Sequence, residues 1–277
     1  MAWTLTEDHE TFLAQADGFL RNDPIANTVP LTVIEAMRMH GHHESALFGW
    51  WTDRGPVEGT FIQTGSRPLL LSPMPERAAQ ELADTLAKRG ATVPGVNGTP
   101  VIAEAFSATW TNRTGTTPHV AMRERLYRLD RLHVPTPPPD GAARPAESTD
   151  RELVVDLFAS FSQEIGNKHS RVDMAAIDAA LTAGRFALWE TAGRPVALAG
   201  RKPIIAGTAR VGPVFTPPEH RRHGYGAAVT AAVTRMAQDA GATDVVLFTD
   251  LANQTSNNIY QHLGYRPVHD GTVITFT

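Results

Sequence analysis

The sequence predicts a mixed α/β fold that is built twice along one chain. Short apolar runs typical of strands alternate with amphipathic segments of helix length, and these segments follow the same order in both halves. A proline-rich stretch separates the halves. The chain has 277 residues, of which 42% are hydrophobic and 19% charged, so it is long enough to bury two cores of ordinary size.

Proline sets the expected boundary between the halves. Four of the five residues at 135–139 are proline, which excludes a helix there and favours extended backbone. We therefore expect a first domain over residues 1–130, a linker or first strand over 131–147 and a second domain over 148–277.

The first half is predicted to hold, in order, two helices, a strand pair, a third strand, a helix, a short strand, a helix and a long strand. The short strand is given no range. The other elements are expected at 8–21, 30–39, 45–52, 57–63, 67–71, 75–90, 101–110 and 119–129.

The second half repeats this order. A capping segment at 148–152 opens its first helix, in which apolar residues recur at helical spacing and which ends near Glu164. The elements that follow are expected at 174–181, 186–189, 195–199, 209–216, 226–240, 244–249, 254–263 and 272–276. The match is one of order and not of residue identity.

Charge and residue usage exclude several classes of protein. The net charge of −4 argues against a protein devoted to nucleic acid or to an anionic membrane surface. Because the chain has no cysteine, thiol nucleophiles, disulfides and Cys-ligated zinc are all excluded. The start resembles no secretory signal, and no run approaches the roughly 18 apolar residues of a membrane span, so we expect a cytoplasmic location.

A glycine-punctuated turn follows the strand expected at 209–216. It contains Arg221, Arg222, Gly224 and Gly226 and runs directly into a helix. Glycine lets the backbone come close to a ligand, and the amides at a helix start attract anions. The pattern therefore predicts a pyrophosphate site, although a plain turn with solvated arginines explains the same residues. No Walker A motif or dinucleotide-binding GxGxxG is present at this turn.

Two motifs of the second half resemble those of the GNAT superfamily of acyl-CoA N-acyltransferases. The family signature is a strand, then Arg/Gln-x-x-Gly-x-Gly/Ala, then a helix, and Arg221, Gly224 and Gly226 match it. About thirty residues further on, the segment 253–265 resembles a second family motif, in which an Asn and a Tyr on a helix face the thioester. The resemblance covers roughly residues 139–277.

The resemblance implies two GNAT-like domains, each a splayed, mostly antiparallel sheet flanked by helices. It also implies acetyl-CoA as co-substrate, with no metal. Backbone groups of the splayed strand and the following turn would bind it, together with polar residues of the second motif. The residues in these positions are Val214, Phe215, Thr216, Arg221, Arg222, His223, Gly224, Tyr225, Gly226, Ala227, Asn253, Ser256, Asn257 and Tyr260.

Tyr260 falls on the family's general-acid position, where its hydroxyl would protonate the departing thiolate. The alternative is an aromatic residue packed in the core beside Ile259 and Leu263. Asn253 is expected to contact the pantetheine arm or to cap the helix, and the two roles are compatible.

The general base is harder to identify, because Arg210 lies near the position where some relatives carry a glutamate. Glu164, beside the expected acceptor loop at 166–170, is the candidate, with an exposed helix-end acid as the alternative. Asp250 could orient a water or the amine, or merely cap the next helix. A chain of water molecules is a further route for the proton.

The first half lacks the glycine motif of the turn and the tyrosine of the second motif. The turn at 72–78 has no Gly-x-Gly, and the helix at 101–110 has no tyrosine. We expect a degenerate, non-catalytic repeat, an arrangement that occurs in tandem GNAT-like proteins of high-GC bacteria. His40, His42 and His43 form no evident metal site, because no second ligand cluster accompanies them.

The resemblance implies an N-acetyltransferase acting on a primary amine of a small molecule, as a monomer or homodimer. Two alternatives stay open, a non-catalytic acyl-CoA sensor and a transferase that takes its acyl group from aminoacyl-tRNA. The tyrosine at 260 argues against the first, and the absence of a broad basic surface argues against the second. No motif identifies the acceptor, because the loops that bind it vary most within such folds.

Overall fold

The computed structural model describes residues 2–40, 45–166 and 173–277, and the chain divides into two compact units. The first unit extends to Leu126 and includes two later segments, Asp250–Ala252 and Val268–Thr277. The second comprises Tyr127–Thr249 and Asn253–Pro267. The units therefore exchange segments of chain, which the expected boundaries at 1–130 and 148–277 do not capture.

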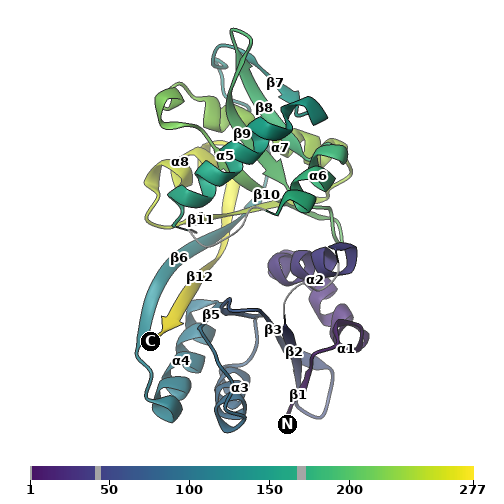
Figure 1. Ribbon diagram of the computed structural model, residues 1–277, viewed down its shortest axis with the longest axis vertical. Helices are drawn as coiled ribbons and strands as arrows, with labels where there is room; N and C mark the ends of the chain where they lie inside the picture. The colour runs from purple at the N-terminus through teal and green to yellow at the C-terminus, as the bar shows by residue number, and fades with distance from the viewer. Residues whose placement is uncertain (1, 41–44, 167–172) are drawn as a thin grey trace. The chain divides into compact units, whose positions relative to one another are not determined.

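The first unit consists of a mostly antiparallel sheet and helices that alternate with its strands along the chain (Figure 1). Its strand order is β1-β2-β3-β4-β5-β12, and only β4 and β5 pair in parallel among the pairs with a described register. The elements are β1 (Ala2–Thr6), α1 (His9–Asn22), α2 (Thr28–His40), β2 (Ala46–Thr52), β3 (Val57–Thr64), β4 (Leu69–Leu71), α3 (Glu76–Lys88), β5 (Gly95–Gly98), α4 (Pro100–Thr114) and β6 (Pro118–Leu129).

The second unit has the strand order β6-β11-β10-β9-β8-β7, in which β10 and β11 are parallel. Its elements are β7 (Ala142–Pro145), the 3₁₀ turn η1 (Ser148–Asp150), α5 (Arg151–Glu164), α6 (Met174–Thr182), β8 (Phe186–Thr191), β9 (Arg194–Arg201), β10 (Thr208–Phe215), the 3₁₀ turn η2 (Pro218–His220), α7 (Tyr225–Asp239), β11 (Asp244–Asp250), α8 (Gln254–His262) and β12 (Tyr265–Phe276).

The two halves of the chain share one order of elements. From β1 to β6 and again from β7 to β12 the order is strand, two helices, three strands, helix, strand, helix, strand. The predicted duplication of topology is confirmed. The last strand of each half joins the sheet of the other half. Strand β12, from the second half, pairs with β5 of the first, and β6, from the first half, neighbours β11 of the second. Both exchanged strands contribute residues to both units.

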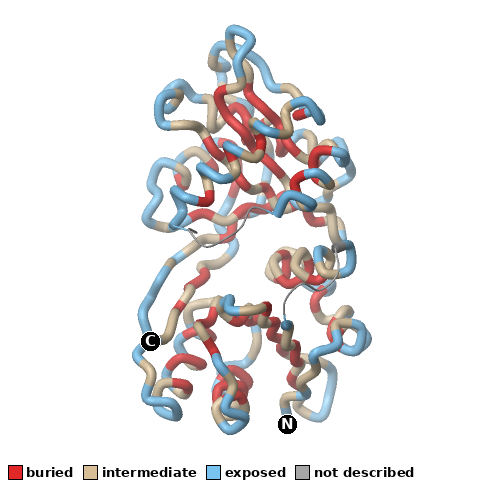
Figure 2. The backbone as a smooth tube through the Cα atoms, viewed as in Figure 1, coloured by how far each residue is buried: buried red, intermediate tan, exposed pale blue. Residues whose placement is uncertain are grey.

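The sheet of the second unit is covered on both faces. Along β9 the side chains alternate, so Ala197 and Ala199 pack in one core with Ala231 of α7 and Tyr260 of α8. Leu198, between them, packs in the other core with residues of α5 and α6. Figure 2 shows the buried residues concentrated along the central strands of this unit. The sheet that leads into the predicted turn therefore packs against α7 and α8 on one face and against α5 and α6 on the other.

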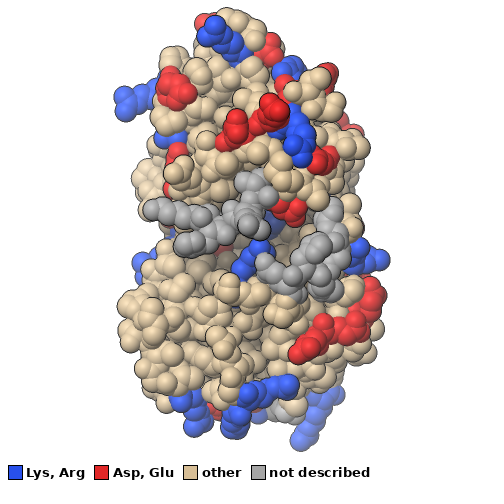
Figure 3. Space-filling model, in the orientation of Figure 1, with Lys and Arg blue, Asp and Glu red and all other residues tan. Residues whose placement is uncertain are grey.

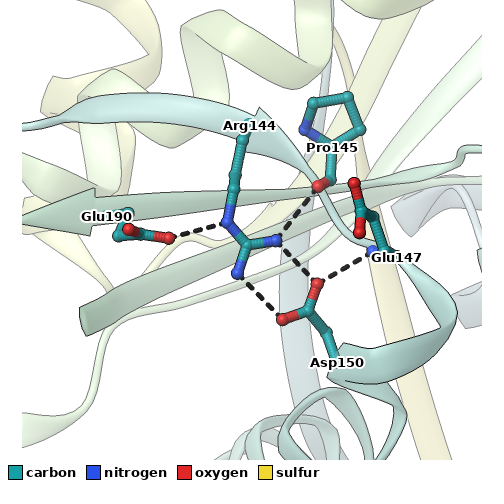
Figure 4. A network of polar contacts seen from close by, with 5 residues as sticks. All are labelled: Arg144, Pro145, Glu147, Asp150 and Glu190. Carbon is teal, nitrogen blue, oxygen red and sulfur yellow. Dashed lines mark hydrogen bonds and ion pairs between the residues drawn. The ribbon is translucent and has the colours of Figure 1, made fainter. Parts of the chain in front are cut away.

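The end of the proline-rich segment is tied to this sheet by an ionic network (Figure 4). Arg144 of β7 donates two hydrogen bonds to the carboxylate of Asp150, of 2.6 and 2.8 Å, and a third of 2.7 Å to Glu190 of β8. These bonds lower the pKa of the Asp150 carboxyl. The prolines before β7 line an apolar cavity of about 200 Å³ beside Trp189 and the alanines of α7.

Two elements differ from the sequence prediction. Strand β1 was not expected, and it pairs with β2 at the edge of the first sheet. Strand β12 begins at Tyr265 and not at 272. Both are edge or exchanged strands, whose partners are distant in the sequence. Strand β7 lies within residues 131–147, where a linker or a first strand was expected.

The surface carries both signs of charge. Figure 3 shows Lys and Arg side chains interspersed with Asp and Glu on the face that it presents. Across the described ranges, none of the helices is both long and apolar enough to span a lipid bilayer.

Candidate active site

The parallel pair β10–β11 opens partway along its length. Their register runs from Thr208–Asp244 to Val211–Leu247 and stops there. At the same point the register of β10 with β9 shifts, between Val211 and Val214. The interruption falls on Gly212-Pro213, as glycine and proline in a strand indicate. The residues that follow are paired only toward β9, which leaves an open edge facing β11.

The predicted strand residues lie at this open edge. Val214 and Phe215 pair with Ala199 and Leu198 of β9. The Phe215 side chain is buried in the core beneath α5 and α6, so only its backbone is available at the opening. Thr216, half-buried, follows the strand.

The turn after β10 ends in an uncapped helix. Gly224 takes the left-handed conformation with φ of 82° just before α7, and no side chain caps the helix start. The first helical bond runs from the amide of Ala228 to the carbonyl of Gly224, at 3.0 Å. The amides of Tyr225, Gly226 and Ala227 therefore have no acceptor within the helix. Amides in this position, at the positive end of the helix dipole, are suited to bind an anion.

Glycine at 226 keeps this site accessible. A Cβ built there would lie 3.4 Å from the Thr216 hydroxyl oxygen, so a larger side chain would project into the space between the strand end and the helix start. Arg222, also in the turn, has a positive φ of 66°. Its side chain is exposed, as is that of His223, whose ring stacks on Tyr225 with centroids 5.4 Å apart.

Arg221 links the turn to α5. Its Nε donates to the carbonyl of Thr216 at 2.9 Å, and its Nη2 pairs with the carboxylate of Glu164 at 2.5 Å. Both side chains of the pair are about half exposed. Glu164 thus lies at the predicted donor turn with its carboxylate paired, which argues against its assignment as the base. Of the expected acceptor loop at 166–170, residues 167–170 lie outside the described residues.

The second motif lies at the start of helix α8 and along it. The side chain of Asn253 caps the helix by accepting from the amide of Ser256 at 3.0 Å. Tyr260 is buried, and its hydroxyl bonds with the Ser256 side chain. Burial raises the pKa of the Tyr260 phenol to about 12, and the bond with Ser256 offsets only part of that rise. The hydroxyl therefore keeps its proton at neutral pH.

Asn257 has a different role from the one expected. Its Oδ1 accepts from the Tyr127 hydroxyl at 2.9 Å, and its Nδ2 donates to the carbonyl of Asn253 at 2.8 Å. Gln261 in turn donates to the Tyr127 hydroxyl at 3.0 Å. Because both polar atoms of the Asn257 side chain bond within the protein, the structure argues against Asn257 as a cofactor ligand. Tyr127 lies on β6, far from α8 in the sequence, so no local pattern could have revealed this network.

Two further predictions concern isolated polar residues. The Asp250 carboxylate accepts from the amide of Ala252 at 2.8 Å, whereas the residue that caps α8 is Asn253. His42 and His43 lie outside the described residues. In the part of the chain that the structure describes, no three His, Cys, Asp or Glu side chains come together as a metal site would require.

The equivalent place in the first unit is closed. Strands β4 and β5 pair at Leu69–Val96 and Leu70–Asn97, and a Cβ on Gly98 would lie 3.2 Å from Leu71, so the strands stay together to their ends. Helix α3 begins at Glu76, whose carboxylate would repel an anion at the helix start. In the described residues, the first unit thus lacks both the open strand and the acid-free helix start of the second.

The chain matches one family model, that of the acetyltransferase (GNAT) family, over residues 152–265. A comparison with curated protein sequences gives no match. Among solved structures, it resembles a GNAT-family acetyltransferase from Colwellia psychrerythraea, with 14% identity and a TM-score of 0.62 over 100% of this chain and 99% of that one. It also resembles a GCN5-related N-acetyltransferase from Sphaerobacter thermophilus, with 14% identity and a TM-score of 0.65 over 98% and 94% of the two chains.

A third similar structure is a tandem GNAT protein from the clavulanic acid biosynthesis pathway. It shares 14% identity with this chain, with a TM-score of 0.59 over 100% of this chain and 98% of that one. At such identities the likeness concerns the fold alone. The expected fold, two GNAT-like domains in tandem, is confirmed.

Proposed function

We propose that this chain, whose residues 152–265 match the acetyltransferase (GNAT) family model, transfers the acetyl group of acetyl-CoA directly to the primary amine of a small molecule. The observation that carries the proposal is the uncapped start of α7 beside the open end of β10. An anion site next to unpaired strand backbone fits a donor that has a pyrophosphate at one end and an amide-containing arm at the other.

We assign the donor to specific groups of this chain. The amides of Tyr225, Gly226 and Ala227 would bind the pyrophosphate, with Arg221 and Arg222 adding charge-assisted bonds. The backbone of Val214, Phe215 and Thr216 would bond the pantetheine arm as an added strand bonds a sheet edge. Of the second motif, Asn253 and Ser256 lie at the start of α8, where each also bonds within the protein, Asn253 to the amide of Ser256 and Ser256 to Tyr260.

The reaction forms a C–N bond and breaks a C–S bond. The amine nitrogen attacks the thioester carbonyl, the sulfur leaves as thiolate, and the nitrogen loses a proton while the thiolate gains one. A backbone amide at the open edge of β10 would polarise the carbonyl. The Tyr260 hydroxyl, protonated at neutral pH, would donate a hydrogen bond to the leaving sulfur.

No carboxylate of the second unit is assigned as base. Glu164 is paired with Arg221, and Arg210 stands on the strand where a carboxylate would be expected. We propose that the amine reaches the site in its neutral form or gives its proton to water.

The test is a screen of primary amines with acetyl-CoA and the full chain, following release of free thiol. The proposal predicts amine-dependent thiol release by the wild type, and none by Gly226→Glu, which places a carboxylate at the pyrophosphate site. Binding of acetyl-CoA without turnover of any amine would instead support a non-catalytic acyl-CoA-binding module.

A further inference from the structure

The helix that carries Tyr260 is held by a tyrosine from the first half of the chain. Tyr127, near the end of β6, is fully buried in the core that also contains Tyr260. Its hydroxyl donates to the Oδ1 of Asn257 at 2.9 Å and accepts from the Nε2 of Gln261 at 3.0 Å. One hydroxyl thus bonds to α8 at two positions.

These two bonds fix both the rotation of α8 and its position along its own axis. Asn257 and Gln261 are four residues apart, so they lie on one face of the helix, about 6 Å apart along the axis at roughly 1.5 Å per residue. A rotation or a shift of α8 would break at least one of the bonds. Tyr260 comes directly before Gln261, so the same bonds determine where its phenol lies.

A chain of hydrogen bonds connects Tyr127 with the hydroxyl of Tyr260. The Nδ2 of Asn257 donates to the carbonyl of Asn253 at 2.8 Å, and the side chain of Asn253 accepts from the amide of Ser256 at 3.0 Å. The Ser256 side chain bonds with the Tyr260 hydroxyl. The first turn of α8 is therefore held through Asn257, which Tyr127 in turn fixes.

The segment that follows β6 holds the end of the same helix. The amide of Asp130 donates to the carbonyl of Gly264 at 3.1 Å, and the amide of His133 to the carbonyl of Leu263 at 3.0 Å. Gly264 has a positive φ of 96°, and a Cβ there would collide with the backbone of this segment. Helix α8 is thus fixed along its face by Tyr127 and at its C-terminal end by the residues that follow.

The Tyr127 hydroxyl is not placed to act as an acid itself. Its proton is donated to Asn257, and its oxygen accepts from Gln261, so both are engaged within the protein. Any effect of this hydroxyl on the reaction therefore passes through α8.

We propose that Tyr127 is a positioning residue: by fixing α8, its hydroxyl holds the phenol of Tyr260 where it can donate to the leaving thiolate. The inference rests on the proposed function and adds to it a residue that lies in neither motif of the second half. Tyr127 belongs to the last strand of the first half, so the half to which no donor site is assigned contributes to the reaction.

The kinetic test replaces Tyr127 by phenylalanine, which keeps the ring in the core and removes both bonds to α8. Single-turnover thiol release at saturating acetyl-CoA should slow about tenfold, because displacing a reacting group by about 1 Å costs up to roughly 10²-fold. The acetyl-CoA dissociation constant should stay constant, because the anion site before α7 is untouched. Gln261→Met removes one bond from an exposed residue and should show a smaller loss in the same direction, even if Tyr127→Phe fails to fold.

Tyr265→Phe is the matched control for the loss of a buried hydroxyl. Tyr265 lies in the same core, and its hydroxyl bonds with Thr234 of α7 at 2.7 Å, so the variant loses a buried bond and keeps those between Tyr127 and α8. It should release thiol at the wild-type rate.

A double variant distinguishes positioning from a general loss of stability. In Tyr127→Phe/Tyr260→Phe the rate should equal that of Tyr260→Phe alone, because a hydroxyl that has been removed cannot be misplaced. Losses that multiply in the double variant, or a wild-type rate in folded Tyr127→Phe, would overturn the proposal.

Amide hydrogen exchange separates this inference from the proposed function, because it requires no amine acceptor. In Tyr127→Phe the amides of α8 should exchange about tenfold faster than in the wild type, while those of α7 keep their rates. Tyr265→Phe should leave exchange in α8 unchanged. This result would support the hold of Tyr127 on α8 even if no amine is acetylated. Unchanged exchange of α8 in Tyr127→Phe would overturn the inference.

Discussion

Replacing Tyr260 by phenylalanine removes one hydroxyl and keeps the packed ring. The ring lies in the core of the second unit, edge-on to Tyr265 with centroids 6.2 Å apart, and a phenylalanine preserves that contact. The loss is therefore confined to the hydroxyl and its bond with Ser256. The variant tests whether this hydroxyl donates a hydrogen bond to the leaving thiolate or whether Tyr260 only packs in the core.

The size of the effect follows from the pKa of the phenol. At about 12 it lies well above the reference value of about 8.5 for a thiol. Complete proton transfer to the thiolate would be uphill by about 5 kcal/mol, so the hydroxyl acts by hydrogen bonding to the developing charge. A bond to a charged group contributes about 1.5–3 kcal/mol. We therefore expect kcat to fall roughly 10- to 100-fold.

The assay is single-turnover thiol release at saturating acetyl-CoA, with the acetyl-CoA dissociation constant measured separately. The dissociation constant should change little, because the bond forms mainly as charge develops on sulfur. Unfolding in urea should show a loss of about 1 kcal/mol from the missing bond with Ser256, which leaves the protein folded. A chemical step within about twofold of wild type would refute the role of Tyr260 and leave it a core aromatic.

The remaining predictions concern two ion pairs. Glu164→Gln should tighten acetyl-CoA binding up to about fivefold in titration calorimetry, because it frees Arg221 from a half-exposed pair; weaker binding would contradict this. Arg144→Leu should lower the free energy of unfolding at pH 7 by about 1–3 kcal/mol. Since Arg144 depresses the pKa of folded Asp150, that stabilisation exists above the unfolded value near 3.8 and is lost as pH falls through the lowered folded value, so the deficit should shrink progressively as the pH falls below 3.8. A deficit that is constant with pH would refute the assignment.

The sequence was sufficient for features set by local chemistry. Gly224, Gly226 and the prolines after β10 mark a turn and a helix start wherever the rest of the chain lies, so both could be predicted. The interruption at Gly212-Pro213 also lies at residues that disrupt strand pairing locally. Helix ranges followed from apolar periodicity.

Features set by distant partners could not be predicted in this way. The exchange of β6 and β12 depends on which strand edge each one meets, and nothing within either strand encodes that. The pairing of Glu164 with Arg221 and the bond from Tyr127 to Asn257 also join residues that are far apart in sequence. Each gives a side chain with an expected cofactor or catalytic role a bonding partner within the protein.

Titration calorimetry with acetyl-CoA is the most direct test of the claim that only the second unit binds the donor. The account predicts one site per chain in the wild type, loss of that site in Gly226→Glu, and its retention in Gln238→Glu, which adds the same charge at the far end of α7. Circular dichroism of both variants would establish that they fold. Two equivalent sites per chain, or undiminished binding by folded Gly226→Glu, would contradict the account.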